Sequence, residues 1–364
     1  RGRTGRSREG GGGPEGSGVN GPAAPRPGLR EVGPYDSPQL EVAARLNTNE
    51  CPLPLPVGFS DDLAAAVRDL ELNRYPDGQM RALREALAER TGHGVDGVWT
   101  ANGSNEILAQ LLMAYGGAGR RAALFEPTYL LHRRLCWLTQ TEIIERRLGP
   151  PFEIDGDAAA WAGGEGAHVV FVCSPNNPTG NTQPLDAIRS LASHSDGLVI
   201  VDEAYVEFGG ESALPLVAAH PNVAVVRTFS KAFALAGARI GYVLASPAVV
   251  EDLERVRLPY HLSTLTQAAG VVALRHADEA AAGLDSIRIV RALSGIDGVT
   301  VFPTKANFVL FQPPGDAQEL WRGLLDRGVL VRDLTAVVPD GLRVTAGTTH
   351  EVDLFLKALE EVLT

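Results

Sequence analysis

The chain has 364 residues, which is enough for one large domain or two modest ones with a sizeable core. Hydrophobic residues make up 45% and charged residues 21%, and no apolar run approaches the roughly 20 residues of a membrane span. The net charge of −11 argues against general nucleic-acid binding. Three widely spaced cysteines indicate reduced thiols rather than a disulfide framework. We expect a cytoplasmic protein without membrane or nucleic-acid partners.

The first 28 residues differ from the rest, because they are rich in Gly, Pro and Arg and offer almost nothing to bury. We predict a disordered tail over 1–28. A targeting peptide is disfavoured, since the tail has neither an apolar segment nor amphipathic spacing. Residues 29–72 are predicted to form an N-terminal arm that packs with a smaller domain or reaches a neighbouring subunit.

From about residue 95, short apolar runs alternate with helical periods, and 104–117 places Ile107 and Leu111 on one helical face. Near-continuous apolar runs are typical of strands that are buried on both faces of a sheet. We predict a large α/β domain over 73–279, with a mostly parallel central sheet and helices on both faces. The predicted strands are 97–103, 121–129, 167–175, 197–205, 222–230 and 238–246.

The pattern changes after about residue 280. Strand-like stretches at 299–312 and 341–347 and a helix-like stretch at 351–363 alternate less regularly. We predict a smaller α+β domain over 280–364. Together with the region before it, this gives a two-domain organisation.

Polar residues follow several of the predicted strands, where each apolar run ends. In open α/β sheets, ligands bind at the edge where the carboxyl ends of parallel strands meet. We therefore expect these side chains to lie around one ligand: Asn102, Tyr129, Asn177, Asp202 and Ser230.

A second group of residues indicates what that ligand is. "GSNE" at 103–106 begins a helix whose N-terminus favours an anion, although Ser104 or Asn105 could simply cap it. Lys231 sits before the apolar run "AFALAGA", and a buried lysine must find a partner or stop being an ammonium. A phosphate cup, a carboxylate at Asp202 (which could otherwise cap a helix) and a lysine fit pyridoxal phosphate.

Longer motifs support this interpretation. "SPNNPTG" (174–180), "VDEAYVEF" (201–208) and "RTFSKAFALAGARIGY" (227–242) occur in the order found in fold-type I aminotransferases, which the chain resembles. Further motifs narrow the resemblance to the histidinol-phosphate aminotransferase family, particularly its actinobacterial forms. They are "LNTNECP", "NRYPDG", "ANGSNEIL", "EPTYLLH", "VRLPYHLSTLTQ" and "GLRVTAGT", spread from about residue 34 to the C-terminus.

The resemblance implies roles for the cofactor residues. Lys231 would form the Schiff base with pyridoxal phosphate and then move a proton, while Asp202 would keep the pyridine nitrogen protonated. Asn177 and Tyr205 would hydrogen-bond the cofactor's phenolic oxygen, and Tyr129 would stack on its ring. The phosphate would be held by Ser104, Asn105, Thr228, Ser230 and Arg239, and by Tyr75 of the partner in a homodimer with shared active sites.

The resemblance also implies the reaction, in which L-histidinol phosphate and 2-oxoglutarate give imidazole-acetol phosphate and glutamate in histidine biosynthesis. Arg343 would clamp the substrate anion, because a planar guanidinium suits both a phosphate and a carboxylate. Asn177, Arg332 and Tyr35 would complete the substrate site. For any single arginine the alternative is an ordinary surface salt bridge.

The sequence departs from the family pattern at three places. Cys51 stands where Asn is common, Asn105 stands where Asp is frequent, and 278–299 looks about one helical turn shorter. The last difference bears on substrate fit and domain closure. The histidines, including His132, and the tryptophans are interpreted as structural, and no metal site is predicted.

Alternative functions share the same cofactor residues. An aromatic amino-acid aminotransferase or a secondary-metabolism paralogue would differ only in the substrate pocket, and a phosphothreonine decarboxylase fits the motifs less well. A non-catalytic pyridoxal-phosphate-binding regulator would need an upstream helix-turn-helix segment, which the Gly/Pro-rich tail does not provide.

Overall fold

The computed structural model describes residues 23, 24, 26, 29, 32–34, 38–280 and 286–363. The chain divides into two units, Arg1–Gln39 and Leu40–Thr364. Nearly all of the predicted tail lies outside the described residues, as do Tyr35 and residues 281–285 of the segment predicted to be shortened. In the first unit, the amide of Leu29 donates to the carbonyl of Arg26 at 3.3 Å, which closes a turn.

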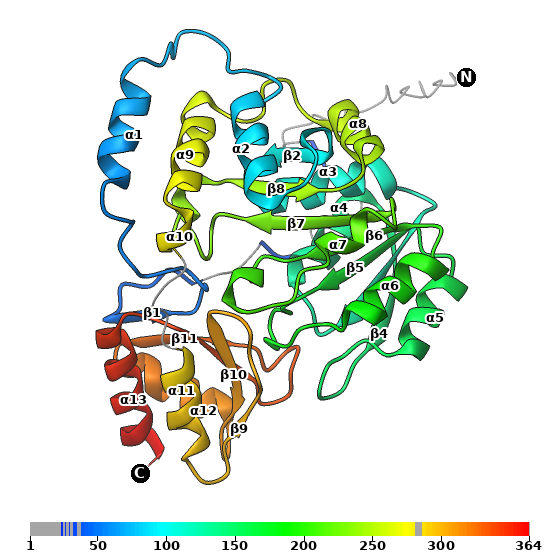
Figure 1. The fold of residues 1–364 in the computed structure, drawn as a ribbon. Helices are drawn as coiled ribbons and strands as arrows, with labels where there is room; N and C mark the ends of the chain where they lie inside the picture. Colours follow the sequence, from blue (N-terminus) through cyan, green and yellow to red (C-terminus); the bar gives the residue numbers. More distant parts are fainter. Residues whose placement is uncertain are drawn as a thin grey trace, which may run out of the picture. The chain divides into compact units, whose positions relative to one another are not determined.

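The larger sheet of the second unit has seven strands (Figure 1). Strand β8 is antiparallel to both of its neighbours, and every other adjacent pair is parallel. This mostly parallel pairing confirms the predicted α/β class. The strand order is β2 (Val98–Ala101), β8 (Gly241–Leu244), β7 (Val223–Thr228), β6 (Leu198–Asp202), β5 (Val169–Cys173), β3 (Arg121–Glu126) and β4 (Glu142–Arg147).

All six predicted strands are present, and β4 is an additional one. In β5 and β6 every residue is buried, which explains their unbroken apolar sequences. Strand β4 reads "EIIERR" and pairs only with β3 at the sheet edge. Most of its charged residues are exposed, and its sequence lacks the apolar run of a central strand.

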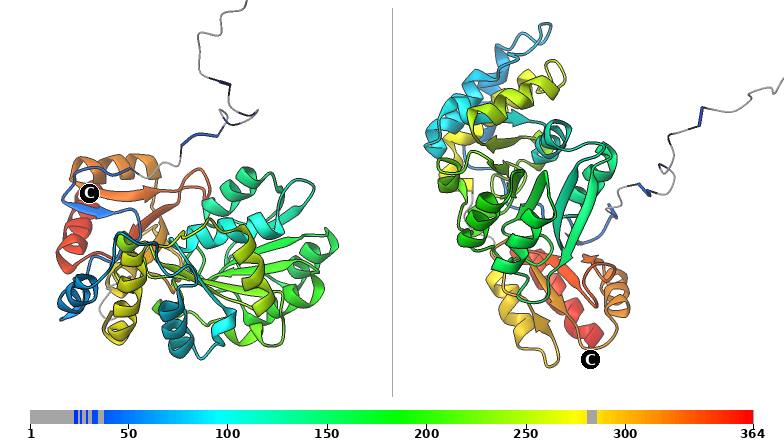
Figure 2. Two further views of the ribbon diagram at one scale, coloured as in Figure 1. Left: turned by 90° about the horizontal axis from the view of Figure 1, so that it is seen from above. Right: turned by 90° about the vertical axis from the view of Figure 1, so that its right-hand side faces the viewer.

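Helices cover both faces of this sheet (Figures 1 and 2). In α3, Ile107, Leu108, Leu111 and Leu112 are buried, as the helical spacing predicts. The helices of this part are α2 (Arg81–Thr91), α3 (Ser104–Tyr115), α4 (Leu130–Thr139), α5 (Gly156–Gly164), α6 (Leu185–His194), α7 (Leu214–Val217), α8 (Pro247–Val256), α9 (Thr264–Arg275) and α10 (Ala277–Ala280), with 3₁₀ turns η2 (Val95–Gly97), η3 (Val206–Phe208) and η4 (Ala236–Ala238).

A second sheet of five strands lies below the first in Figure 1. Its first strand comes from the N-terminal arm, since Arg45 of β1 pairs in parallel with Leu330 of β11. The strand order is β1 (Ala44–Leu46), β11 (Val329–Asp333), β12 (Leu342–Thr345), β10 (Phe308–Gln312) and β9 (Thr300–Val301), and its helices are α11 (Ser286–Ser294), α12 (Ala317–Asp326) and α13 (Thr349–Leu363).

The arm also contacts the larger sheet's helices, because α1 (Phe59–Arg68) packs against α9. Segment 40–68 therefore touches elements of both sheets. We propose that the domain boundaries lie near residues 72 and 280. Within the described part of the chain, no helix is both long and apolar enough to cross a membrane.

Candidate active site

The carboxyl ends of β2, β3, β5, β6 and β7 lie at the same edge of the larger sheet, since these strands run in one direction. The polar residues predicted from the sequence follow these strands. Asn102 serves the local loop, because its Nδ2 donates to Glu106 Oε2 at 2.9 Å and to the carbonyl of His261 at 2.6 Å. Two of the others lie close to Lys231: Ser230 precedes it in the chain, and the charge of Asp202 acts on its amine.

Lys231 lies in the loop after β7, and its Nζ donates to two backbone carbonyls of the arm. The distances are 3.2 Å to Thr48 O and 2.9 Å to Asn49 O. Burial and, next, the positive charge of Arg343 lower the pKa of Lys231 to about 8. A lysine with this pKa is neutral more often at neutral pH than an exposed one, so it can act as a nucleophile or a base.

Asp202, at the end of β6, is 2% exposed. Its Oδ1 accepts from the amide of Ala204 at 3.1 Å, and its Oδ2 lies 3.2 Å from His132 Nε2. His132 is fully buried in α4 and stacks on Phe171, with ring centroids 4.5 Å apart. The carboxylate is therefore held in place by a backbone amide and an imidazole.

Tyr205, Asn177 and Arg343 form a hydrogen-bonded chain. Arg343 Nη1 donates to Asn177 Oδ1 at 2.5 Å, and Asn177 Nδ2 donates to the Tyr205 hydroxyl at 3.4 Å. Because a guanidinium only donates, the Asn177 amide must turn its oxygen toward Arg343 and its nitrogen toward Tyr205. Burial is the main cause that raises the pKa of Tyr205, so its hydroxyl keeps its proton.

A cup for an anion forms where α3 begins beside the loop after β7. Arg239 Nη1 donates to Ser230 Oγ at 3.2 Å, and Thr228 Oγ1 donates to the same oxygen at 3.0 Å. A Cβ at Gly241 would lie 2.1 Å from the amide nitrogen of Ser104, so only glycine lets the start of α3 approach β8 this closely.

No capping side chain accepts a hydrogen bond from the first amides of α3. Gly103 occupies the N-cap of α3, and no side chain caps the helix there, which contradicts the alternative that Ser104 or Asn105 serves as the cap. Ser104 is half-buried at the first helical position, whereas Asn105 is exposed. Free amides at a helix N-terminus beside a guanidinium suit a phosphate group.

Two arginines of the smaller sheet face the same way. In the antiparallel pair of β11 and β12, Arg332 lies directly opposite Arg343. Directly opposed residues of an antiparallel pair project from the same face, and like charges placed there repel each other. Arg343 is 7% exposed and also donates from Nη2 to Asn47 O at 3.0 Å. An anion between the two guanidinium groups would relieve the repulsion.

Of the other predicted tyrosines, the structure describes Tyr75 and Tyr129. Tyr75 is 79% exposed and stacks on Tyr260, with ring centroids 4.4 Å apart. Tyr129 is half-buried immediately before α4, with its ring 5.5 Å from that of His132. Tyr35 lies outside the described residues.

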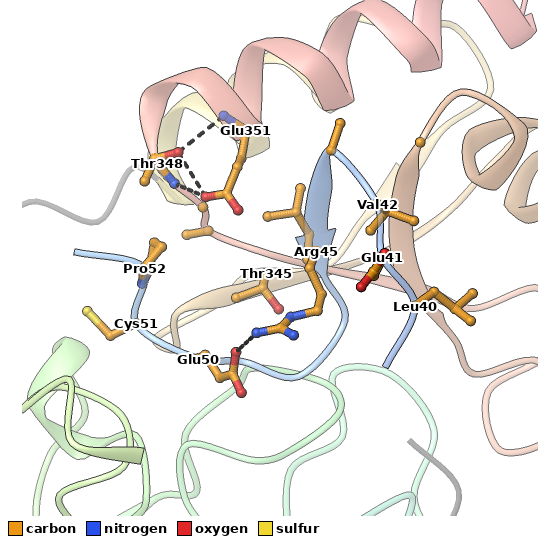
Figure 3. A pocket seen from close by; sticks show the side chains of 15 residues that line it. Leu40, Glu41, Val42, Arg45, Glu50, Cys51, Pro52, Thr345, Thr348 and Glu351 are labelled. Carbon is orange, nitrogen blue, oxygen red and sulfur yellow. Dashed lines mark hydrogen bonds and ion pairs between the residues drawn. The ribbon is translucent and has the colours of Figure 1, made fainter. Parts of the chain in front are cut away.

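A cavity of about 920 Å³ opens between the arm and the start of α13 (Figure 3). Arg45 Nη2 donates to Glu50 Oε2 at 3.1 Å in its wall, and Thr345 lines it close by. Since Glu50 follows Asn49, which contacts Lys231, this cavity adjoins the cluster around the lysine.

Sequence reasoning missed two residues of the cluster. The sequence predicts a structural role for His132, but its ring contacts Asp202. Its position in the first turn of the helix after β3 could have indicated that it lies near the carboxyl ends of the strands. Asn49 was quoted only as part of a motif, although it contacts both Lys231 and Tyr205. No local pattern marks Asn49, because its partners lie 156 or more residues away.

The chain was compared with known proteins. The family model for aminotransferase class I and II matches residues 44–359. Histidinol-phosphate aminotransferase from Thermobifida fusca (strain YX) is 48% identical over 346 residues, covering 92% of this chain and 94% of the relative. That of Frankia casuarinae is 47% identical over 93% of this chain and 90% of the relative.

Solved structures give the same result. The structure of histidinol-phosphate aminotransferase from Sinorhizobium meliloti in complex with pyridoxal-5'-phosphate matches with a TM-score of 0.80 and 26% identity, over 89% of this chain and 91% of that one. An aspartate aminotransferase from Thermotoga maritima, at 22% identity and a TM-score of 0.79 over 88% of this chain and 91% of that one, shows the fold alone.

Proposed function

This chain belongs to the family of class I and II aminotransferases, and from that membership we propose that it acts as a pyridoxal-phosphate-dependent histidinol-phosphate aminotransferase. It converts L-histidinol phosphate and 2-oxoglutarate to imidazole-acetol phosphate and glutamate, a step of histidine biosynthesis. The observation that carries this conclusion is the near-half identity to enzymes of that name across almost the whole chain. As an enzyme of amino-acid biosynthesis, it is proposed to work in the cytoplasm.

The residues present fit the cofactor. The open start of α3 with Arg239 and Ser230 suits its phosphate, buried Asp202 suits a protonated ring nitrogen, and the lowered pKa of Lys231 suits capture of an aldehyde. When bound, pyridoxal phosphate supplies an aldehyde carbon for amine exchange and a ring that draws electrons away from the substrate's Cα.

The protein's own groups divide the remaining work. Lys231 Nζ is the base that takes the proton from the substrate's Cα, since its pKa of about 8 lies near the working pH. Asp202 holds a proton on the ring nitrogen, and His132 fixes the carboxylate. Tyr205 and Asn177 would hydrogen-bond the cofactor's phenolic oxygen, and Tyr129 would stack on its ring. The phosphate would be held by Ser104, Asn105, Thr228, Ser230 and Arg239.

The substrate anion is bound by the smaller sheet. Arg343 is the clamp, because its buried planar guanidinium, held by Asn177 and Asn47, suits a phosphate ester or a carboxylate. Arg332, on the same face, adds a second positive charge. Tyr35 is proposed to contact the substrate phosphate. Both amino donors carry an anion, so one clamp serves both half-reactions.

Arg343→Ala is expected to lower kcat/KM for histidinol phosphate and for glutamate together, by about a hundredfold or more, because two charge-assisted hydrogen bonds are lost. Arg343→Lys keeps the charge without the planar fork and should fall between the two. Steady-state kinetics with each donor checks this, and thermal unfolding controls for lost contacts to Asn177 and Asn47. A defect confined to glutamate would refute a shared anion site.

We also propose that the enzyme is a homodimer with shared active sites, in which Tyr75 reaches the partner's cofactor phosphate. The supporting observation is an exposed apolar surface around Tyr75, where large side chains would otherwise face water. Its members are Leu72, Tyr75, Leu258, Tyr260 and Leu265, exposed by 44 to 79%. Sedimentation equilibrium tests this, and a monomer at micromolar concentration would contradict it.

The experiment that tests the function is a visible spectrum of the protein loaded with pyridoxal phosphate, titrated separately with histidinol phosphate and with phenylalanine. We expect histidinol phosphate to bleach the cofactor band at much the lower concentration. A preference for phenylalanine would keep the chemistry and identify an aromatic amino-acid aminotransferase. No band after addition of the cofactor would refute the proposal.

A further inference from the structure

Asn49, between β1 and Pro52, contacts residues of both sheets: Thr345 of β12 and Tyr205, which follows β6. It is 1% exposed, and its φ of 55° is in the left-handed region, which asparagine enters more readily than most residues. The roles proposed above do not include Asn49.

On one side, Asn49 is bound to the smaller sheet. Its amide donates to Thr345 Oγ1 at 3.1 Å, and Asn307 Nδ2 donates to its carbonyl at 3.1 Å. Thr345 Oγ1 in turn donates to Asn49 Oδ1 at 3.1 Å. Because the threonine hydroxyl already accepts the backbone amide, its single hydrogen is directed at Oδ1. The side-chain amide of Asn49 is thereby oriented, with its nitrogen away from Thr345.

On the other side, Asn49 contacts two residues of the larger sheet. Its Nδ2 donates to the Tyr205 hydroxyl at 3.0 Å, and its carbonyl accepts from Lys231 Nζ at 2.9 Å. Asn177 Nδ2 donates to the same hydroxyl at 3.4 Å. With two amide donors on its oxygen, the Tyr205 hydroxyl is left with its own hydrogen for a third group.

We infer that Asn49 is a positioning residue of the transamination reaction, which keeps Tyr205 a hydrogen-bond donor toward the cofactor and ties that orientation to Thr345 of the smaller sheet. The inference rests on the proposed function, in which Tyr205 bonds the cofactor's phenolic oxygen. Donation to that oxygen stabilises its anionic form, so the pKa of the bound cofactor reports the Tyr205 orientation.

Asn49→Asp is the decisive change. An aspartate still accepts from Thr345 but cannot donate, so the Tyr205 hydroxyl would turn its hydrogen toward residue 49. Spectrophotometric pH titration of the bound cofactor should then show its visible transition raised by about one pH unit. The charged or titratable groups that face Tyr205 from other elements are Arg343, Lys231, Asp202 and Cys173, and all are unchanged in this variant.

Three further variants separate positioning from folding and from charge. Asn49→Gly accepts the left-handed backbone without strain and adds no charge. It removes one of the two donors that orient the Tyr205 hydroxyl, so a smaller shift in the same direction is expected. Thr345→Val should shift the transition in the same direction, whereas Thr345→Ser, which keeps the hydroxyl, should restore the wild-type value. Figure 3 shows Thr345 beside the segment that carries Glu50.

The outcomes are distinguishable. Unshifted transitions in Asn49→Asp and Asn49→Gly, with cofactor bound, would overturn the inference. If Asn49→Asp does not fold by circular dichroism, the Thr345→Val and Thr345→Ser pair decides in the same way. A wild-type protein without a cofactor band would overturn the proposed function itself, not the role of Asn49 within it.

Discussion

Lys231→Ala is expected to lower turnover by more than about 10⁴-fold, because the substitution removes both the amine that captures the cofactor and the base at the substrate's Cα. The variant should still fold, since Lys231 Nζ contributes only two hydrogen bonds to backbone carbonyls. Removing an amine with a pKa of about 8 from a buried site leaves no unpaired charge behind. Stopped-flow mixing with histidinol phosphate measures the half-reaction, and steady-state assays with both substrates measure turnover.

The chain offers matched controls, because its only other lysines are Lys305 and Lys357. Lys357 lies on α13 with a side chain that is 75% exposed, 3.9 Å from Glu361, so Lys357→Ala should leave turnover unchanged. Borohydride reduction of the loaded protein followed by peptide mass spectrometry should place the cofactor on Lys231 alone. Label on Lys305 or Lys357, or repeated turnover by Lys231→Ala, would show that the lysine has been misassigned.

Asp202→Asn is expected to retain bound cofactor but to lower the single-turnover rate by about 10³-fold or more. A neutral amide cannot hold a proton on the ring nitrogen, and without that charge the ring withdraws electrons poorly. The exchange is nearly isosteric, and the bond from the Ala204 amide to Oδ1 can persist, so the loss reflects charge rather than shape. Rapid mixing with histidinol phosphate measures the proton-transfer step directly.

The neighbouring histidine refines this test. His132 Nε2 contacts Asp202 Oδ2 at 3.2 Å and acts on the ring nitrogen only through Asp202. His132→Asn should therefore reduce the rate much less than Asp202→Asn. Asp252→Asn, at a half-exposed carboxylate of α8 that pairs with Tyr115, serves as a control for loss of one negative charge. Near-normal single-turnover rates in Asp202→Asn would mean that another group protonates the ring.

The shared position of several residues proposed to bind the cofactor could be predicted from the sequence, and the reason is topological. Each buried parallel strand appears as an unbroken apolar run, so the residue that ends the run is identified locally. Parallel pairing then brings those ends to one edge, which is why Asp202, Asn177 and Ser230 lie at the same edge of the sheet as Lys231. In the larger sheet, β4 is the strand that the sequence analysis did not predict. It lies at the sheet edge with one partner and carries charges in place of an apolar run.

The substrate side and the arm were decided by the tertiary structure. Nothing in "LNTNECP" or "GLRVTAG" states that Asn49 meets Thr345, because the two are 296 residues apart in the chain. The opposition of Arg332 and Arg343 follows from the register of β11 and β12, which the residues between those strands do not specify locally.

The sequence by itself thus determined the fold class and the residues that end the central strands, because short-range apolar patterns and the common direction of parallel strands fix them. The cofactor followed from the chemistry of Lys231 and Asp202 and from the motifs that resemble aminotransferases. Only the tertiary structure decided how the arm joins the smaller sheet at β1, why Asp202 has His132 behind it, and how Asn49 connects Lys231, Tyr205 and Thr345. Those contacts join segments 70 to 296 residues apart. The His132–Asp202 contact forms within the larger sheet and its helices, whereas the contacts of Asn49 form only when the arm packs between the two sheets.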